Sequence, residues 1–210
     1  MQTESAPQGI NKKETLEGKQ FRVSMDEVAN GVGTKTDVGK LEMHLMCTNV
    51  YSSLYNARSN KLIEPCSLAD VMQRYIGIIG MIQEYEPCSE IYEELLDLKL
   101  SLASIKYVAI DYVELVNMML VDELQVLMYG KYKYSANNWK KIDPPLRYMD
   151  AFGRHLLHMM DSGNDIIDDE SGLPALSHCM CNLSFFAELI LTRDPYDGYD
   201  RWVEREKSNK

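Results

Sequence analysis

Apolar side chains recur at helical spacing over most of the chain, and this periodicity restricts the fold more than composition does. The clearest stripe has members at i, i+4, i+7, i+11 and i+14, which share one face of an α-helix: Ile91, Leu95, Leu98, Leu102 and Ile105. No stretch of sequence shows the period-2 alternation, flanked by hairpin turns, that is typical of a half-buried β-strand. The sequence therefore predicts an all-α fold.

Helix start and stop signals divide the periodic sequence into about five main helices. Ser67 and Ser89 are expected to cap the first two, and Gly130 is a candidate terminator of the third. Gly163 is expected to end the fourth helix, and Pro174 suits the first turn of the last one. The expected helices cover residues 68–85, 89–105, 108–128, 146–160 and 174–191. The predicted architecture is a compact helical bundle.

The chain has 210 residues and a formal net charge of −10. This acidic balance argues against a nucleic-acid polymer as the main partner, because such binders usually carry a basic patch. The five cysteines match no zinc-binding spacing and are expected to be reduced thiols. Residues 1–19 lack the apolar core of a secretory signal, and the apolar runs considered are too short to span a bilayer. We therefore expect a cytoplasmic protein with no membrane partner.

Composition changes toward both ends of the chain. Residues 1–20 are polar and are expected to form a flexible lead, and residues 194–210 a polar tail. A single all-α domain is expected over residues 21–193. A glycine-punctuated loop at 31–40 carries two candidate substrate-binding lysines, Lys35 and Lys40, although the spacing of a Walker A loop is missing.

Polar and aromatic side chains are concentrated between residues 129 and 139. Lys133 can supply positive charge to a phosphate, and Asn138 can read the edge of a base. The rings of Tyr134 and Trp139 can stack on a base. The plainer interpretation is an aromatic cluster that packs at an edge of the core. Because a buried polar group costs free energy unless it finds a partner, the density of such groups favours a binding site.

Two later helices carry titratable side chains. Asp150 and Arg154 are i,i+4 neighbours on one helix face, and His155 points away from that face by more than a quarter turn. Periodicity alone favours a solvated ion pair as the explanation of the first two. His178 and Asn182 are i,i+4 neighbours among apolar residues of the last helix. A satisfied core histidine and a functional histidine both remain open there.

The order of these residues along the chain resembles a known family. The order is Gly33-x-Lys35-x-Asp37-x-Gly39-Lys40, Tyr129-Gly130-x-x-Lys133-Tyr134-x-x-x-Asn138-Trp139, Arg154-His155-Leu156, Asp168-x-Glu170-Ser171-Gly172-Leu173-Pro174, then Leu176-x-His178 and Asn182. It resembles the phage-associated dATP/dGTP diphosphohydrolase N-terminal domain family, loosely grouped with MazG-like all-α nucleotide pyrophosphohydrolases. The resemblance covers roughly positions 31–46 and 118–191. Residues 52–117 look like a helical insertion, and Ala175 stands where the family usually has a histidine.

The resemblance implies a Mg²⁺-dependent nucleotide pyrophosphohydrolase. Such an enzyme would convert a purine (deoxy)nucleoside triphosphate to a nucleoside monophosphate and pyrophosphate. The hypothesis assigns catalysis to Asp150, Arg154, His155 and His178, substrate binding to Lys35, Lys40, Lys133, Tyr134, Asn138, Trp139 and Asn182, and Mg²⁺ to Glu123, Asp150 and Glu170. A phage-encoded protein of this kind would act in the host cytoplasm.

Two alternatives stay open at this point. In the first, a module of the same fold sequesters a nucleotide without hydrolysing it, which the alanine at position 175 favours. In the second, the chain is a protein-interaction module. Residues 52–117 would then form a partner or self-association surface, and a homo-oligomer would result.

Overall fold

The computed structural model describes residues 40–57, 65–84 and 88–192. In these ranges the helices are α2 (Thr48–Asn56), α3 (Leu68–Glu84), α4 (Ser89–Lys106), α5 (Tyr112–Lys133), α6 (Arg147–Ser162) and α7 (Ala175–Thr192), with 3-10 helices η2 (Met43–Leu45) and η3 (Asn138–Lys141). Strand-like pairing within the described ranges is limited to an isolated bridge between Ile167 and Pro174. The all-α prediction is confirmed. These helices belong to the compact unit 41–210, and the predicted limits near residues 20 and 193 lie outside the described residues.

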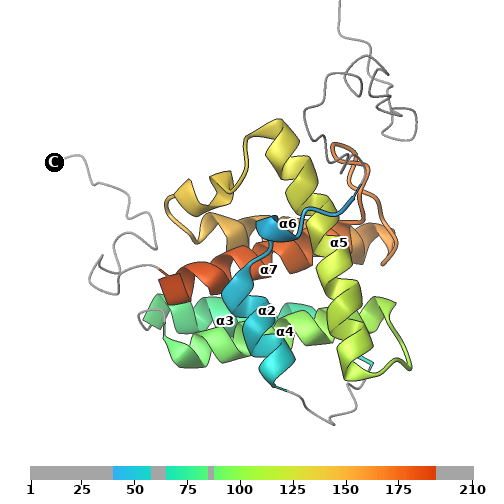
Figure 1. The fold of residues 1–210 in the computed structure, drawn as a ribbon. Helices are drawn as coiled ribbons and strands as arrows, with labels where there is room; N and C mark the ends of the chain where they lie inside the picture. Colours follow the sequence, from blue (N-terminus) through green and yellow to red (C-terminus); the bar gives the residue numbers. More distant parts are fainter. Residues whose placement is uncertain (1–39, 58–64, 85–87, 193–210) are drawn as a thin grey trace, which may run out of the picture. The chain divides into compact units, whose positions relative to one another are not determined.

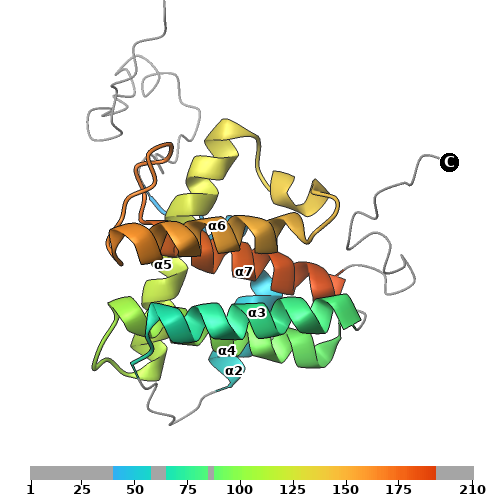
Figure 2. The same ribbon diagram turned by 180° about the vertical axis from the view of Figure 1, so that it is seen from behind.

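Helix α7 is the central element of the bundle. Helices α2, α4, α5 and α6 pack against it, as the two ribbon views show (Figures 1 and 2). Its buried side chains lie around most of its circumference and include Leu176, Met180, Leu183 and Phe186, each at most 2% exposed. Burying a side chain of this size contributes about 1.5–3 kcal/mol. Much of the stability of the fold therefore depends on the packing of α7.

The apolar composition of α7 corrects one expectation. By length and composition alone, α7 could cross a membrane, whereas the sequence interpretation considered only shorter apolar runs. In the structure, 67% of this helix is buried inside the protein. A helix that is apolar on all sides is expected wherever other helices surround it. The packing of α7 therefore accounts for its composition.

The segment predicted as an insertion, residues 52–117, packs into the same core. Helices α3 and α4 pack against each other, α4 packs against α7, and α3 packs against α6 (Figure 2). The Tyr75 hydroxyl of α3 donates to the Met149 carbonyl of α6 at 3.2 Å, and the Tyr75 ring lies 5.1 Å from the Phe152 ring. Gly153 permits this approach, because a Cβ there would lie 2.7 Å from the Tyr75 hydroxyl oxygen. The segment therefore supports α6.

Local capping accounts for two helix starts. The Ser67 hydroxyl oxygen accepts from the Asp70 backbone N–H at 3.2 Å, and the hydroxyl donates to the Asp70 carboxylate at 2.5 Å. The predicted start of α3 is thus confirmed. The Asp111 carboxylate accepts from the Glu114 backbone N–H at 2.9 Å and caps α5. Both caps satisfy N–H groups that have no partner within their own helix.

Three predicted helix limits are wrong. Helix α5 begins at Tyr112 and not at Val108. Helix α4 begins at Ser89 itself, and the residue before it, Cys88, provides no side-chain cap. Helix α5 passes through Gly130 and ends at Lys133. A glycine inside a helix costs about 1 kcal/mol relative to alanine, which the packing of α5 against α7 outweighs. The additional turn carries Lys133.

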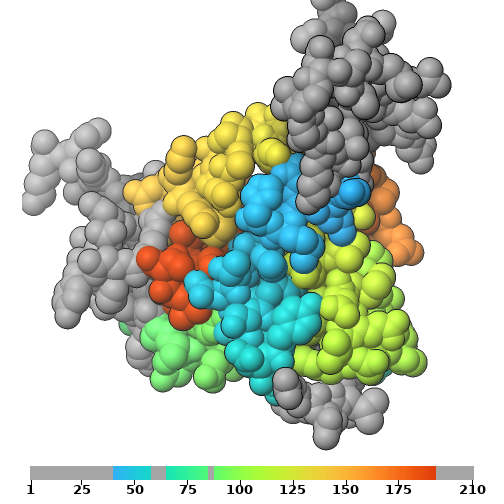
Figure 3. All heavy atoms as spheres, in the orientation of Figure 1, coloured from blue at the N-terminus to red at the C-terminus, as the bar shows by residue number. Residues whose placement is uncertain are grey.

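Helix α2 was not expected. The backbone N–H groups of Asn49 and Val50, at its start, donate to the carboxylate of Glu188 on α7 at 3.0 and 3.1 Å. A negative charge stabilises the N-terminal end of a helix. In the space-filling view, the blue-to-cyan residues of η2 and α2 lie between α5 and the red end of α7 (Figure 3). Because Glu188 lies on a distant helix, no local signal in residues 41–54 could predict this cap.

Candidate functional site

A pocket of about 610 Å³ lies between the end of α5, η3, α6, the α6–α7 loop and one face of α7. Ten of the predicted site residues line it: Lys133, Tyr134, Asn138, Trp139, Asp150, Arg154, His155, Glu170, His178 and Asn182. These residues come from four separate segments of the sequence. A cavity of this volume is in the range that holds small-molecule ligands.

One face of α7 forms a wall of the pocket. His178, Cys181, Asn182 and Phe185 follow each other at i, i+3, i+4 and i+7, and all four line the cavity. Because an α-helix rises 1.5 Å per residue, His178 and Phe185 are about 10 Å apart along the helix axis. We call the part of the pocket near His178 the histidine end and the part near Phe185 the aromatic end.

The aromatic end is a cluster of packed rings. Trp139 stacks on Phe185, with ring centroids 4.8 Å apart and planes 18° from parallel. The Tyr148 ring lies 4.9 Å from Phe185, and its hydroxyl donates to the Trp139 carbonyl at 2.6 Å. The Lys140 ammonium lies over the Trp139 ring, 5.3 Å from its centroid. A ligand would therefore meet the edge of the indole, or displace Lys140, and base contact by Trp139 and Asn138 stays a prediction.

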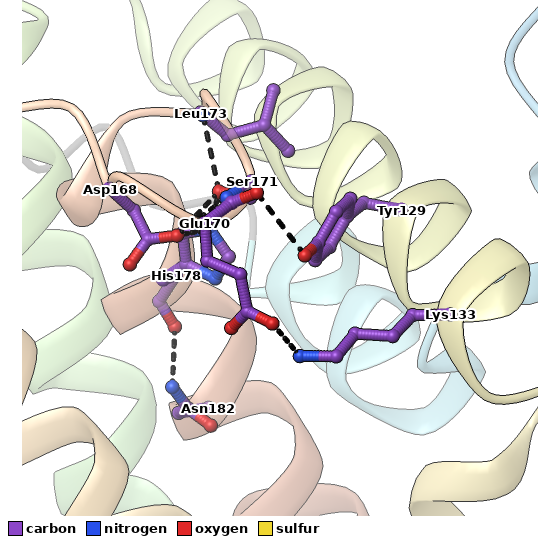
Figure 4. Close-up of polar contacts among 8 residues, drawn as sticks. All are labelled: Tyr129, Lys133, Asp168, Glu170, Ser171, Leu173, His178 and Asn182. Atoms are coloured by element: carbon purple, nitrogen blue, oxygen red, sulfur yellow. Dashed lines mark hydrogen bonds and ion pairs between the residues drawn. The ribbon is translucent and has the colours of Figure 1, made fainter. Parts of the chain in front are cut away.

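Lys133 lies at the histidine end and is already paired. Its ammonium forms an ion pair with the Glu170 carboxylate, which joins the last turn of α5 to the α6–α7 loop (Figure 4). The hydrogen bond to Glu170 raises the pKa of Lys133. The ammonium also lies over the Tyr129 and Tyr134 rings, 6.0 and 5.0 Å from their centroids. The predicted phosphate-binding cation is thus present and charged, with a carboxylate as its partner.

His155 and His178 stack on each other across the interface of α6 and α7. Their ring centroids are 5.0 Å apart and their planes are 20° from parallel. Burial, followed by the neighbouring imidazole, lowers the pKa of His178 to about 4. Burial also lowers the pKa of His155. Both rings are therefore neutral at pH 7 and can each accept a proton.

The α6–α7 loop positions Asp168 and Ser171 against His178. The Asp168 carboxylate accepts from the Ser171 backbone N–H at 2.9 Å and from its hydroxyl at 2.8 Å, and Ser171 Oγ lies 2.7 Å from His178 Nε2. Burial opposes ionisation of Asp168, but the Ser171 hydrogen bonds outweigh it and lower the pKa of this carboxyl. Gly172 follows at a φ of +70°, which other L-residues rarely adopt.

The remaining predicted residues at the pocket have accessible polar groups. Asp150 and Arg154 are exposed i,i+4 neighbours on α6. The Asn182 side-chain amide donates to the His178 carbonyl at 2.9 Å, within the same helix. Lys35 lies outside the described residues. Lys40 is exposed and belongs to the separate unit 1–40, so its role stays a prediction.

Glu123 does not lie at the pocket. Its side chain is 1% exposed, and its carboxylate pairs with the Lys99 ammonium and accepts from the Ser184 hydroxyl at 2.7 Å. Lys99 also donates to Ser184 and to the Tyr51 hydroxyl. Burial raises the pKa of Glu123, against the effect of Lys99. The tertiary structure therefore places Glu123 in a buried polar network of the core.

The predicted magnesium ligands are not brought together. Asp150 and Glu170 line the pocket, but Glu170 pairs with Lys133 and Glu123 is in the core. In the described ranges, no group of three or more His, Cys, Asp or Glu side chains is placed to hold a metal ion. The residues present therefore do not fit a Mg²⁺ ion held by this set alone.

Several pocket residues were missed by sequence reasoning. Arg147 shares the α6 face of Asp150 and Arg154 at i, i+3 and i+7, a spacing that could have revealed it. Tyr148 and Phe185 were missed as well. Tyr129 and Asp168 belong to the residue order that carries the resemblance, but they were not among the predicted site residues. Lys131 also lines the pocket and pairs with Glu42 at 2.5 Å. These contacts join distant segments, so no local pattern assigns them.

Residues 104–198 match the family model described as dATP/dGTP diphosphohydrolase, N-terminal. The matched segment includes α5, η3, α6 and α7, which form most of the pocket wall. The resemblance found in the sequence is thus confirmed over this range, and nucleotide diphosphohydrolysis is the activity class that the match supports. No curated protein and no solved structure matched the chain.

Proposed function

We propose that this chain, whose residues 104–198 match the dATP/dGTP diphosphohydrolase family, hydrolyses purine (deoxy)nucleoside triphosphates in the pocket described above. The products would be a nucleoside monophosphate and pyrophosphate. One observation carries the proposal: ten residues selected for substrate-binding, catalytic or metal-binding roles line one cavity. The family match supports the reaction class, and the lining of the pocket supports its location.

The pocket suggests how the substrate is oriented. Lys133 and Arg154 lie toward the histidine end and would neutralise phosphate charge. Trp139 and Asn138 lie toward the aromatic end and would contact the base. The two ends are about 10 Å apart along α7, which suits the separation of a base from its phosphates. The phosphates would compete with Glu170 for Lys133.

The chemistry needs a water, a proton acceptor and charge neutralisation. The water oxygen would bond to the α-phosphorus while the bond from that phosphorus to the bridging oxygen breaks, and pyrophosphate leaves with the electron pair. A neutral imidazole, His178 or His155, would accept the water proton. Asp150 would orient the water from α6. Mg²⁺ would enter as part of the substrate, because it is usually bound by triphosphate oxygens with one or two carboxylates.

The test is a product assay on the full chain. The protein is incubated with Mg²⁺ and each purine and pyrimidine dNTP and NTP, and products are separated by ion-exchange chromatography. We expect a monophosphate and pyrophosphate in equal amounts from dATP or dGTP. Arg154→Ala should lower kcat/KM about 100-fold, since it removes a cation that stabilises developing charge. Arg74→Ala is the matched control. Arg74 is exposed on α3, and its guanidinium donates a hydrogen bond to the Ser101 hydroxyl on α4.

Two outcomes contradict the proposal. If no nucleotide yields pyrophosphate, hydrolysis is excluded under these conditions. If Arg154→Ala and Arg74→Ala are equally active, the pocket is not the active site. Recovery of intact nucleotide from a tight complex would support the alternative in which the protein binds without hydrolysis.

A further inference from the structure

Ser171 lies at the centre of a short hydrogen-bonded chain that ends on His178 (Figure 4). The residue is 4% exposed. Its Oγ lies 2.8 Å from Asp168 Oδ1 and 2.7 Å from His178 Nε2, and it accepts from the Leu173 backbone N–H at 3.2 Å. Asp168 and Ser171 belong to the residue order that carries the resemblance, but neither was among the predicted catalytic, substrate-binding or metal residues. Three neighbours around one hydroxyl restrict where its hydrogen can be.

The distances determine which atom donates to which. A serine hydroxyl has one hydrogen, and an ionised carboxylate can only accept. If the hydroxyl donated to His178, two oxygen acceptors would face each other at 2.8 Å without a hydrogen between them. The Ser171 hydroxyl therefore donates to Asp168 and accepts from His178 Nε2–H. A neutral His178 then carries its lone pair on Nδ1.

The free nitrogen belongs to a ring that lines the pocket. His178 Nδ1 makes no hydrogen bond in the part of the chain that the structure describes, and the ring plane is held by stacking on His155. The side chain is 12% exposed. In many hydrolases a histidine accepts the proton of the nucleophile with one ring nitrogen, while a third residue binds the other ring nitrogen and orients the ring.

We propose that Asp168 and Ser171 are positioning residues, which hold His178 in its Nε2–H tautomer so that Nδ1 accepts the proton of the attacking water. The inference rests on the proposed function. In the step, the water oxygen bonds to the α-phosphorus, the α–β anhydride bond breaks, and the water proton moves to Nδ1. The imidazolium that forms donates through Nε2 to Ser171, whose hydroxyl donates to the Asp168 carboxylate. The carboxylate charge then stabilises the cation.

The tautomer can be measured without any assay of activity. The chain has four histidines, so long-range ¹H–¹⁵N spectra of a ¹⁵N-histidine sample can be assigned with a His178→Gln variant. At pH 7 we expect a protonated Nε2 and an unprotonated Nδ1 for His178. Asp168→Ala removes the oxygen that accepts from the Ser171 hydroxyl, which frees the hydroxyl hydrogen for His178. We therefore expect this variant to move the proton to Nδ1.

Controls separate positioning from folding. Asp169→Ala makes the same change at the next, exposed position and should leave the tautomer and the activity unchanged. Ser171→Ala should give a mixture of tautomers with native circular dichroism. In the product assay, Asp168→Ala should lower kcat about 100-fold with little change in KM. The double variant with His178→Gln should lose no more activity than His178→Gln alone, because the residues act as one unit.

The outcomes distinguish this inference from the proposed function. A wild-type His178 protonated on Nδ1, or an Asp168→Ala variant that keeps Nε2–H, overturns the inference even if the protein hydrolyses nucleotides. A wild-type protein that has the expected tautomer and hydrolyses no nucleotide instead overturns the proposed function and, with it, the role of Nδ1 as proton acceptor.

Discussion

Lys99 with Glu123 and Lys133 with Glu170 are two ion pairs built from the same side chains in opposite environments. The first pair joins α4 to α5, and both side chains are 1% exposed. The second joins α5 to the α6–α7 loop at the pocket, with side-chain exposures of 32% and 64%. Residue type therefore does not reveal whether a charged pair supports the core or serves a site. Burial and the number of additional partners decide it.

The buried pair has further polar partners inside the core. Ser184 donates to Glu123 and accepts from Lys99, and Tyr51 also accepts from Lys99. A buried ion pair is maintained only when further hydrogen bonds offset the loss of hydration. At the pocket, water can replace either partner of the Lys133–Glu170 pair. A phosphate can therefore compete for Lys133, whereas no ligand can reach Lys99.

The largest effect should come from breaking the buried pair. Lys99→Met leaves the Glu123 carboxylate buried without its cation, and we expect the free energy of unfolding to fall by about 3–5 kcal/mol. Urea denaturation, monitored by circular dichroism, measures this fall in the free energy of unfolding. Lys106→Met is the matched control on the same helix, because Lys106 pairs with Asp122 at 2.8 Å but is 35% exposed. It should cost about 1 kcal/mol or less.

Equal losses of stability in Lys99→Met and Lys106→Met would contradict the difference between the buried pair and the exposed pair. A double variant, Lys99→Met with Glu123→Leu, sharpens it further. Removing both charges should recover part of the loss of the single variant, since no unpaired charge is then left in the core. A double variant that is less stable than Lys99→Met would show that the loss comes from packing.

An intermediate effect is expected from pH, and it should arise at the pocket. The pKa of His178 is about 4 in the folded protein, below its ordinary value of 6.5. The unfolded chain therefore binds the proton first as pH falls, so stability is lost between about pH 6.5 and pH 4. The loss due to His178 is at most about 3 kcal/mol. The lowered pKa of Asp168 adds a further loss below its ordinary value of 3.8.

Denaturation at pH 7, 5.5 and 4 measures this dependence. His178→Gln removes the titrating group, so its stability should fall less steeply than that of the wild type over the same range. Exposed His44→Gln is the control and should follow the wild type. Parallel curves for the wild type and His178→Gln would show that burial does not depress the pKa of His178.

The smallest effect should come from the pocket pair. Glu170→Gln removes a carboxylate that is 64% exposed, so the free energy of unfolding should change by less than about 1 kcal/mol. Because Lys133 no longer has an anionic partner, binding of a non-hydrolysable triphosphate should tighten about two- to fivefold in calorimetry. Glu93→Gln, at an exposed position of α4, is the control. Weaker binding by Glu170→Gln would mean that Glu170 contacts the ligand itself.

Sequence reasoning selected ten of the residues that line the pocket but could not assign their partners. Lys133, Arg154 and His178 were selected for their chemistry, and all three line the cavity. Glu123 was selected for the same reason and lies in the core with Lys99. The stacking of His155 on His178 was also not foreseen, since His155 was placed on a different helix face from Asp150. Pairings across separate helices leave no local pattern.

The amino-acid sequence by itself determined the all-α class, many of the helix limits and the order of residues that resembles the matched family. These depend on local properties: the spacing of apolar side chains, capping residues such as Ser67, and side-chain chemistry along the chain. Only the tertiary structure decided that Glu123 pairs with Lys99, that Glu188 caps α2, and that Ser171 orients His178. The physical reason is that the state of a polar group depends on its burial and on its partners, which come from distant segments.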